Sequence, residues 1–314
     1  MTVTLYFDNG KSIDLGRPRT LKILQSYDTP AHNMIATFPY EYPLPNAVRA
    51  KVYYKGKEIF DGNVDEQIIS VSKSGYILTI DARTSSELLD NEAYPTTYHN
   101  PSLHEIYRVH AKPYGIKGVV GNGILNGDFT VTKGTSEWEV ISEFCKTLFN
   151  VQPQITYDGY LYAEKKSLGS EKVIFSNTLN NAHHFYEAKI ENKRYGVISQ
   201  IVYKPETKST YKSGLQNPYL NDKSINIRRL VNLSGLQSYE RNTKIEKTFK
   251  KSMLDSFKIT LKTDICIEGE IGGKALFRDE KLGSFENLII YEKQLVISQN
   301  GTYCQLKLIP EKNI

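Results

Sequence analysis

Residues 48–80 constrain the fold of this chain more than any other stretch, because their side chains alternate between hydrophobic and polar as in a β-strand. Ala50 and Val52 share one face of the first strand, while Arg49 and Lys51 lie on the opposite face. The alternation resumes after each of two glycine-containing turns, so the pattern predicts an antiparallel meander. Such a meander is typical of one wall of a small barrel or sandwich.

Glycines mark both turns and one position inside a strand. The turns are Lys55-Gly56-Lys57 and Lys73-Ser74-Gly75, where glycine supplies the positive φ of a tight reversal. Gly62 instead lies within the returning strand 58–64. A glycine there predicts a β-bulge or a close approach of another segment of backbone.

Further β-strands surround the meander at both ends of the chain. Before it, residues 2–8, 21–26 and 33–38 have strand patterns, and the proline-rich stretch 39–46 links two strands across the surface. Residues 1–82 therefore provide about six strands, enough to close a small barrel. The later strands predicted near the C-terminus are 187–203 (a strand pair or one bent strand), 257–261, 274–277, 288–298 and 303–309, the last one after an Asn300-Gly301 turn.

Between these β regions the hydrophobic period changes to that of helices. Ser102 and Glu105 have capping-box spacing, as do Ser136 and Glu139. The second box begins a helix whose apolar stripe is Trp138, Ile141, Phe144, Cys145, Leu148 and Phe149. Residues 154–162 predict a hairpin with an Asp158-Gly159 turn. This segment therefore has the pattern of a compact α+β domain.

Positive charge is concentrated in one stretch. The chain carries a formal charge of +5, but residues 189–251 alone hold 14 Lys and Arg against 5 Asp and Glu, an excess of nine. Residues 205–222 predict an exposed loop, and 238–254 a basic helix with Ile245 and Phe249 facing inward. A nucleic-acid surface and a solvated or subunit-facing surface both fit this charge, and no nucleic-acid-binding motif accompanies it.

Composition favours a multidomain protein without a membrane span. A length of 314 residues suits two or three domains, and the apolar runs are of strand length. The N-terminus lacks the features of a signal peptide, so folding in a bacterial cytoplasm is expected. Three scattered cysteines, Cys145, Cys266 and Cys304, exclude a disulfide framework and predict buried thiols. The 22 tyrosines suit strands and protein interfaces.

No pattern predicts a catalytic, cofactor-binding or metal-binding residue. The sequence contains neither a G-x-S-x-G nor an H-E-x-x-H motif. The adjacent His183 and His184 would point to opposite faces of a strand, and Asp61, Asn63 and Asp65 lack the glycine of a calcium loop. We therefore expect no enzyme activity and no cofactor.

Short motifs follow one another along the chain: F-x-G at 60–62, D-x-R at 81–83, L-L-D at 88–90, P-x-x-Y at 95–98, K-G-x-S-x-W at 133–138, D-G at 158–159, and G-x-F at 283–285 followed by Val296 and N-G at 300–301. This ordered set resembles the phage baseplate hub family, which includes late control protein D-like hubs and the tail hubs of Mu-like and PBSX-like phages. The resemblance covers nearly the whole chain.

The resemblance implies a mainly β fold with two small antiparallel β-barrels of the tail-tube type and an inserted α+β domain. The expected domains are a first barrel at 1–92, the α+β domain at 93–186, joined by helix 238–254, and a second barrel at 187–314. Residues 187–204 and 256–314 would build that second barrel. Hubs of this family are homotrimers whose six barrels form a ring of pseudo-sixfold symmetry.

The resemblance also implies a structural function in a contractile tail. The trimer would join the tail tube, or a tube-initiator protein, to a trimeric central spike, contact other baseplate proteins, and line a channel that DNA crosses only as cargo. The location would be the baseplate of a virion or tailocin assembled in the bacterial host cytoplasm. We hypothesise that Lys244, Lys247, Lys250 and Lys251 contact an acidic neighbour in the baseplate.

Two other functions remain open. Residues 131–138 with the following helix resemble the opening of a LysM glycan-binding module, which would make the chain a tail-associated protein that binds or degrades cell-wall glycan. A stand-alone nucleic-acid-binding β protein is the second alternative. The sequence does not distinguish an infectious phage from a DNA-free bacteriocin.

Overall fold

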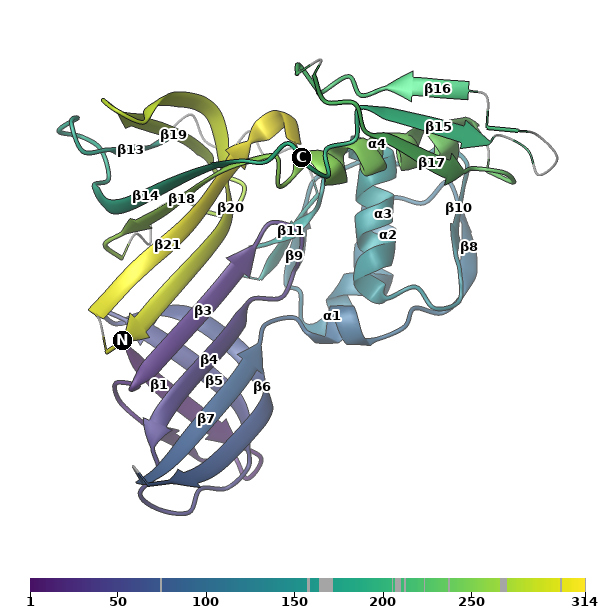
Figure 1. Ribbon diagram of the computed structural model, residues 1–314. Helices are drawn as coiled ribbons and strands as arrows, with labels where there is room; N and C mark the ends of the chain where they lie inside the picture. The colour runs from purple at the N-terminus through teal and green to yellow at the C-terminus, as the bar shows by residue number, and fades with distance from the viewer. Residues whose placement is uncertain are drawn as a thin grey trace. The chain divides into compact units, whose positions relative to one another are not determined.

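The computed structural model describes residues 1–73, 75–156, 159–163, 172–204, 206, 210–211, 213–222, 224–236, 238–265, 270–299 and 301–313. The chain forms two compact units (Figure 1). The first comprises Met1–Glu171 with Glu292–Gln305, and the second Lys172–Tyr291 with Leu306–Ile314. The structure is mainly β with large antiparallel sheets, as the sequence predicted.

The first unit begins with seven strands. They are β1 (Thr2–Phe7), β2 (Ser12–Asp14), β3 (Thr20–Ser26), β4 (Asn33–Pro39), β5 (Ala47–Tyr54), β6 (Lys57–Ser72) and β7 (Gly75–Arg83). Their order in the sheet is β3-β4-β7-β6-β5-β1-β2, and residues 292–297 of β20 (Gly283–Ser298) pair with β3. The antiparallel pairs β5–β6 and β6–β7 confirm the predicted meander.

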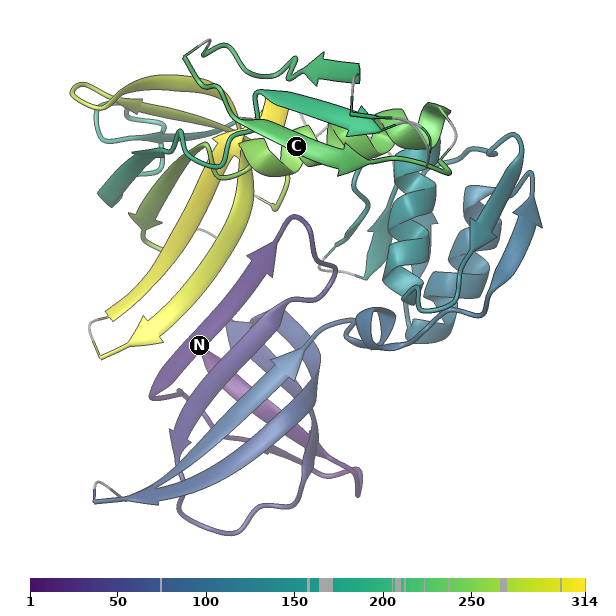
Figure 2. The ribbon, with the colours of Figure 1, turned by 45° about the vertical axis from the view of Figure 1, so that its right-hand side comes forward.

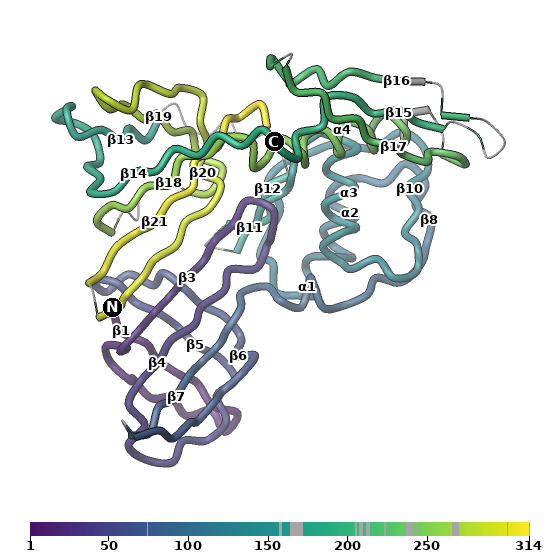
Figure 3. The backbone as a smooth tube through the Cα atoms, viewed as in Figure 1, coloured from purple at the N-terminus to yellow at the C-terminus, as the bar shows by residue number. Residues whose placement is uncertain are grey.

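Alternate side chains of these strands form the core, because successive residues of a strand point to opposite faces. The fully buried ones include Leu5, Ile23, Met34, Phe60 and Ile80. Figures 2 and 3 show the sheet curling around this core. Among the described strands, no pairing joins β2 to β3, so the predicted closure of a barrel is not confirmed.

Gly62 has the close backbone approach that its position predicted. A Cβ atom at this residue would lie 2.7 Å from the carbonyl oxygen of Arg83 and 2.7 Å from Cζ of Phe60. The strand register also shifts nearby, between Val64 and Glu66 of β6. The glycine of the F-x-G motif therefore leaves room for the backbone of Arg83, at the end of β7, to approach β6 closely.

The rest of the first unit is the predicted α+β segment. It contains α1 (Glu87–Asp90), β8 (Thr96–His99), α2 (Leu103–Ile106), a π-helical turn (Tyr107–Ala111), a 3-10 turn (Lys112–Tyr114), β9 (Gly118–Val120), β10 (Asp128–Val131), α3 (Glu137–Phe149), β11 (Gln154–Ile155) and β12 (Tyr160–Tyr162). The capping box of Ser136 and Glu139 is formed in both directions, with 2.9 Å from the Ser136 amide to the Glu139 carboxylate.

The apolar stripe of α3 faces the core of this segment. Trp138, Ile141, Phe144 and Cys145 are buried together with Leu103 of α2. Strands β11 and β12 form the predicted antiparallel hairpin, although Asp158 of its turn lies outside the described residues. As expected for buried thiols, burial raises the pKa of Cys145 to about 12, and Cys304 is buried as well. Cys266 lies outside the described residues.

The second unit contains further strands of the same sheet, although residues 292–305 of the last two strands belong to the first unit. Its strands are β13 (Val173–Ser176), β14 (Phe185–Asn192), β18 (Phe257–Thr263), β19 (Lys274–Asp279), β20 (Gly283–Ser298) and β21 (Gly301–Pro310), and the sheet follows the order β14-β18-β21-β20. Strand β19 pairs with both β20 and β13. These strands include all four that the sequence predicted after residue 256.

A separate layer of the second unit differs from the prediction. Residues 187–203 are not one strand or one strand pair: β14 ends at Asn192, and β15 (Gln200–Lys204) pairs with β16 (Ser213–Gln216) and β17 (Arg228–Asn232) in a three-stranded sheet. Strand β16 lies within the predicted loop 205–222. The predicted basic helix is α4 (Ser238–Met253), and it packs on this sheet (Figure 1).

Candidate interaction surfaces

The four lysines singled out in the sequence all lie on α4 but do not form one surface. Lys244, Lys247 and Lys251 are exposed at positions i, i+3 and i+7, which share one helical face. No ion pair involves these three among the described residues. Lys250 is half-buried instead, because its ammonium group contacts the Glu246 carboxylate at 3.1 Å and lies 5.7 Å from the centre of the Tyr219 ring.

Tyr219 and Glu246 complete this small cluster around Lys250. The Tyr219 hydroxyl donates a 2.7 Å hydrogen bond to the Glu246 carboxylate. Burial, followed by this bond to a carboxylate, raises the pKa of Tyr219 to about 12, while the hydrogen bond from Tyr219 holds the pKa of Glu246 below its usual value. Lys250 thus stabilises the second unit internally and is less available to a partner than the other three lysines.

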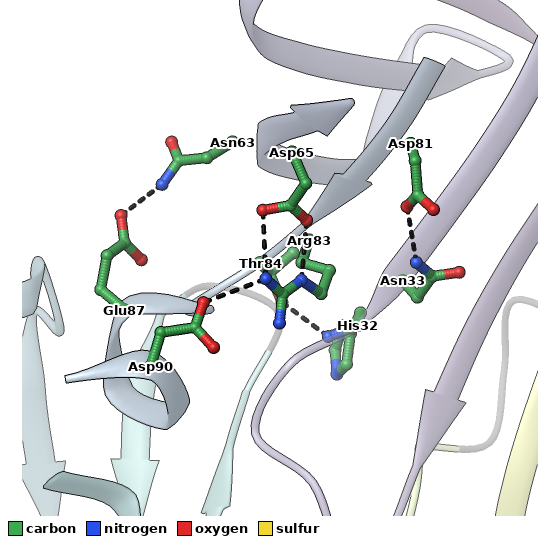
Figure 4. A network of polar contacts seen from close by, with 9 residues as sticks. All are labelled: His32, Asn33, Asn63, Asp65, Asp81, Arg83, Thr84, Glu87 and Asp90. Atoms are coloured by element: carbon green, nitrogen blue, oxygen red, sulfur yellow. Dashed lines mark hydrogen bonds and ion pairs between the residues drawn. The ribbon is translucent and has the colours of Figure 1, made fainter. Parts of the chain in front are cut away.

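A polar network joins the first seven strands to α1, and it uses the residues of two resemblance motifs (Figure 4). Arg83 of the D-x-R motif donates from Nε to Asp65 at 2.7 Å and from Nη2 to Asp90 at 3.0 Å. Asp90 ends the L-L-D motif. The hydrogen bonds to Asp65 and Asp90 raise the pKa of Arg83, so its charge is fixed.

Neighbouring contacts extend this network. Asp81, also of the D-x-R motif, accepts a 2.8 Å hydrogen bond from the Asn33 side chain, and the Asn63 amide donates to Glu87 at the start of α1. Figure 4 shows these side chains pointing toward one another across β4, β6, β7 and α1. The motifs therefore mark a structural junction, which fixes the direction in which the chain leaves the sheet.

A buried hydrogen-bonded chain of side chains has the order of a hydroxyl–imidazole–carboxylate triad. Tyr98 contacts His110 Nε2 at 2.8 Å, His110 Nδ1 contacts Glu137 at 2.5 Å, and Tyr114 donates to Glu137 at 2.9 Å. Burial, with the nearby carboxylates of Glu105 and Glu137, raises the pKa of Tyr98, whereas an activated nucleophile needs a lowered one. We therefore interpret this chain as a structural network. No sequence pattern indicated it, since 27 residues separate His110 from Glu137.

The described residues offer no group of three or more His, Cys, Asp or Glu side chains that could hold a metal ion. The structure pairs His183 with Phe175 through a β-bridge. No helix in the described part of the chain has the length and hydropathy needed to span a bilayer.

An exposed strand edge of the first unit carries several apolar side chains. Strand β5 pairs with β6 only as far as Asn63, so beyond that point β6 is paired on the β7 side alone. The exposed edge contains Ile68, Ile69 and Val71, and Val71 has an exposed fraction of 67%. Natural proteins usually protect such edges with charges, prolines or bulges. Residues 67–72 carry no charge and no proline.

The comparisons with known proteins concern the fold. No protein-family model matches the sequence, and no curated protein matches it. The structure is similar to the 43 kDa tail protein of prophage MuSo2 from Shewanella oneidensis, with a TM-score of 0.80, 16% identity and coverage of 99% of each chain. It is also similar to the tail protein from Neisseria meningitidis MC58, with a TM-score of 0.73, 18% identity and coverage of 98% of this chain and 96% of that one.

A third similar structure comes from a secretion system. It is the Escherichia coli c3393 protein, a component of the type VI secretion system described as structurally similar to the T4 bacteriophage tail proteins gp27 and gp5. The TM-score is 0.56 at 8% identity, with coverage of 93% of this chain and 73% of that one. The chain therefore has the fold of prophage tail proteins and of related secretion-system components. The resemblance that the motifs indicated is confirmed.

Proposed function

We propose that the protein is a structural hub of a contractile-tail baseplate, in a phage or a phage-tail-like particle. The observation that supports this most is the similarity in fold to the MuSo2 tail protein, which extends over 99% of both chains. As a hub, the protein would act as a homotrimer that joins the tail tube to a trimeric central spike and lines the channel between them. Its role would be mechanical, without catalysis or a cofactor.

The proposed architecture has two barrels of the tail-tube type, at 1–92 and 187–314, with the α+β domain at 93–186. The first seven strands, which curl around one core, support the first barrel. The sheet β14-β18-β21-β20 supports the second. The layer formed by β15, β16, β17 and α4 has its own small core and would be an addition to that second barrel.

Free strand edges support a ring of several copies. The apolar edge of β6 in the first unit and the outer edge of β14 in the second unit each have a strand on one side only among the described strands. Pairing of β6 in one copy with β14 in the next would leave neither edge exposed, and three such contacts would close a ring. Such pairing would explain why residues 67–72 of β6 carry no protective charge.

Light scattering on the purified full chain tests the trimer. We expect a mass about three times the 35.8 kDa of one chain, reached at the higher protein concentrations. Val71→Lys and Ile69→Lys place charges on the β6 edge and should shift the population to monomer. Val48→Lys is the matched control, because Val48 is also exposed but lies on β5. Equal effects of all three variants would contradict pairing through β6.

Co-purification with the other tail proteins tests the hub role itself. Co-expressed with the tube and spike proteins of the same tail gene cluster, the chain should be retained with both. A chain that binds neither, but clears peptidoglycan in a zymogram or sediments with it, would be a cell-wall protein instead. The same assay tests the four lysines of α4. As a hypothesis, Lys244, Lys247, Lys250 and Lys251 contact an acidic baseplate neighbour, and their reversal to Glu should weaken that complex.

A further inference from the structure

The sheet β16-β15-β17 has one covered face and one open face. Ile201 and Tyr203 of β15 and Val231 of β17 pack with Ile245 and Phe249 of α4, so one face of the sheet belongs to a small core. Side chains of a strand alternate between faces, so the residues between them point away from α4. Figures 1 and 2 show the three strands as one layer with α4 along one side.

Strand register places the residues of the open face in rows. Val202 is opposite Leu230 on β17 and opposite Gly214 on β16, and in the next row Gln200 is opposite Arg228. Lys204 follows Val202 on the same face. We define the open sheet face as Gln200, Val202, Lys204, Gly214, Arg228 and Leu230.

The centre of the open sheet face is apolar and its surface is accessible. Leu230 has an exposed fraction of 58%, and Val202 beside it is half-buried. The side chains of Gln200 and Val202 lie close against Gly214, since a Cβ at that position would lie 3.0 Å from Nε2 of Gln200 and 3.7 Å from Cγ2 of Val202. A glycine inside a strand often marks a site where another chain approaches closely.

The rim of the open sheet face is positively charged, and no acidic side chain among the described residues pairs with its cations. Lys204 and Arg228 flank the apolar pair in neighbouring rows, and within the described residues neither takes part in an ion pair. Two other cations of the same unit are paired: Arg194 contacts Asp222 at 3.0 Å and Lys262 contacts Glu187 at 2.5 Å. An apolar centre inside a charged or polar rim is the usual anatomy of a protein interface.

We propose that the open sheet face docks a protein surface that has an apolar side chain surrounded by carboxylates. The apolar residue would pack on Val202 and Leu230 above Gly214, and the carboxylates would pair with Arg228 and Lys204. A nucleic acid fits less well, because its phosphates need positive charge across the contact rather than around an apolar centre. The inference rests on the geometry of this face and does not require the hub function.

Synthetic polymers test the chemistry directly on the full chain. Fluorescence anisotropy would compare three labelled probes: the random copolymer of glutamate and tyrosine, poly-glutamate, and a DNA duplex of about 20 base pairs, which is long enough for several phosphate contacts. We expect the copolymer to bind most tightly, because only it offers carboxylates together with apolar groups. Equal binding of poly-glutamate, or preferential binding of the duplex, would contradict the proposal.

Matched variants locate the binding. Arg228→Glu and Leu230→Ser should each lower the affinity for the copolymer about tenfold, as changes at the centre of an interface do. The controls are Lys247→Glu, with the same charge change on α4, and Leu215→Ser, an exposed leucine on the opposite face of the sheet. If Lys247→Glu or Leu215→Ser lowered the affinity for the copolymer as much as Arg228→Glu and Leu230→Ser, the copolymer would not bind at the open sheet face. All four side chains are exposed, and circular dichroism would verify that each variant is folded.

Discussion

The cations of strand β5 and those of strands β15 and β17 lie on exposed sheet faces, yet their surroundings differ. Arg49 on β5 contacts Asp61 of β6 at 2.5 Å, and Lys51 contacts both Glu58 at 2.9 Å and Asp61 at 3.1 Å. Lys204 and Arg228 have no such partner among the described residues. Cross-strand pairs of opposite charge stabilise a sheet, whereas unpaired cations add little to it. The first face therefore uses its charges for its own stability, and the second has its charges available for a partner.

The difference between side chains with and without a partner also applies to buried groups, where the loss of a partner should have the largest effect on the free energy of unfolding. Glu137→Ala removes the carboxylate between His110 and Tyr114, and it leaves the buried His110 and the half-buried Tyr114 without their partner. Leaving a buried polar group without its hydrogen-bond partner costs about 1–3 kcal/mol per group. Urea unfolding followed by circular dichroism should show a loss of this size in the free energy of unfolding.

Glu143→Ala is the control for this variant, because Glu143 lies on the same helix but is exposed. Its free energy of unfolding should change by less than about 0.5 kcal/mol. A small effect of Glu137→Ala would mean that the network is not required for stability. The rule that a side chain with a partner inside the chain contributes to stability would then not hold for its most buried example.

Substitution of Arg83 should have the next largest effect on stability, because Arg83 bridges two carboxylates at the junction with α1. Arg83→Ala should destabilise the chain by about 1–2 kcal/mol, a value reduced by the partial exposure of all three groups. Arg108→Ala, at an exposed position with no ion pair among the described residues, should be nearly neutral. If both variants unfold at the same urea concentration as the wild type, the junction does not depend on Arg83.

Asp61→Asn tests the paired face of β5 and β6, with an expected loss of about 1 kcal/mol at neutral pH. Burial opposes ionisation of the Asp61 carboxyl, but hydrogen bonds from Arg49 and Lys51 outweigh burial and lower its pKa. A lowered pKa contributes stability that is complete above the usual aspartate pKa and is lost as the pH falls through the lowered value.

The wild type and the Asp61→Asn variant should therefore converge in stability below about pH 4. Urea titrations at several pH values would measure the difference. A difference that stays constant from neutral to acidic pH would show that the effect of the substitution is steric and does not come from the ion pairs.

The partnered regions were also the easier ones to predict from sequence. The period-two alternation predicted β5, β6 and β7, and the glycine inside a strand predicted the close approach at Gly62, because both signals are local. The capping box at Ser136 and Glu139 spans four residues and was confirmed. Patterns of this kind depend on backbone geometry that the neighbouring residues alone determine.

Long-range partners could not be predicted in the same way. The contact of Arg83 with Asp65 and that of His110 with Glu137 depend on which strands and helices meet in the fold. The open sheet face was missed because β16 and β17 are short strands with polar residues, and β16 lies inside the stretch 205–222, whose composition is typical of loops. The sequence located the excess of positive charge in residues 189–251. It did not indicate that some of these cations lie on α4 and others on the sheet β16-β15-β17.

Reversal of the unpaired lysines of α4 should have the smallest effect on stability. A triple variant of Lys244→Glu, Lys247→Glu and Lys251→Glu should unfold within about 0.5 kcal/mol of the wild type, because no described acidic group depends on these side chains. Lys250→Glu should cost more, since it places like charges at Glu246 and Lys250 and removes the cation over Tyr219. If the triple variant were less stable than Lys250→Glu, the three exposed lysines would have partners within the chain. A charge without an observed partner would then no longer indicate a docking surface.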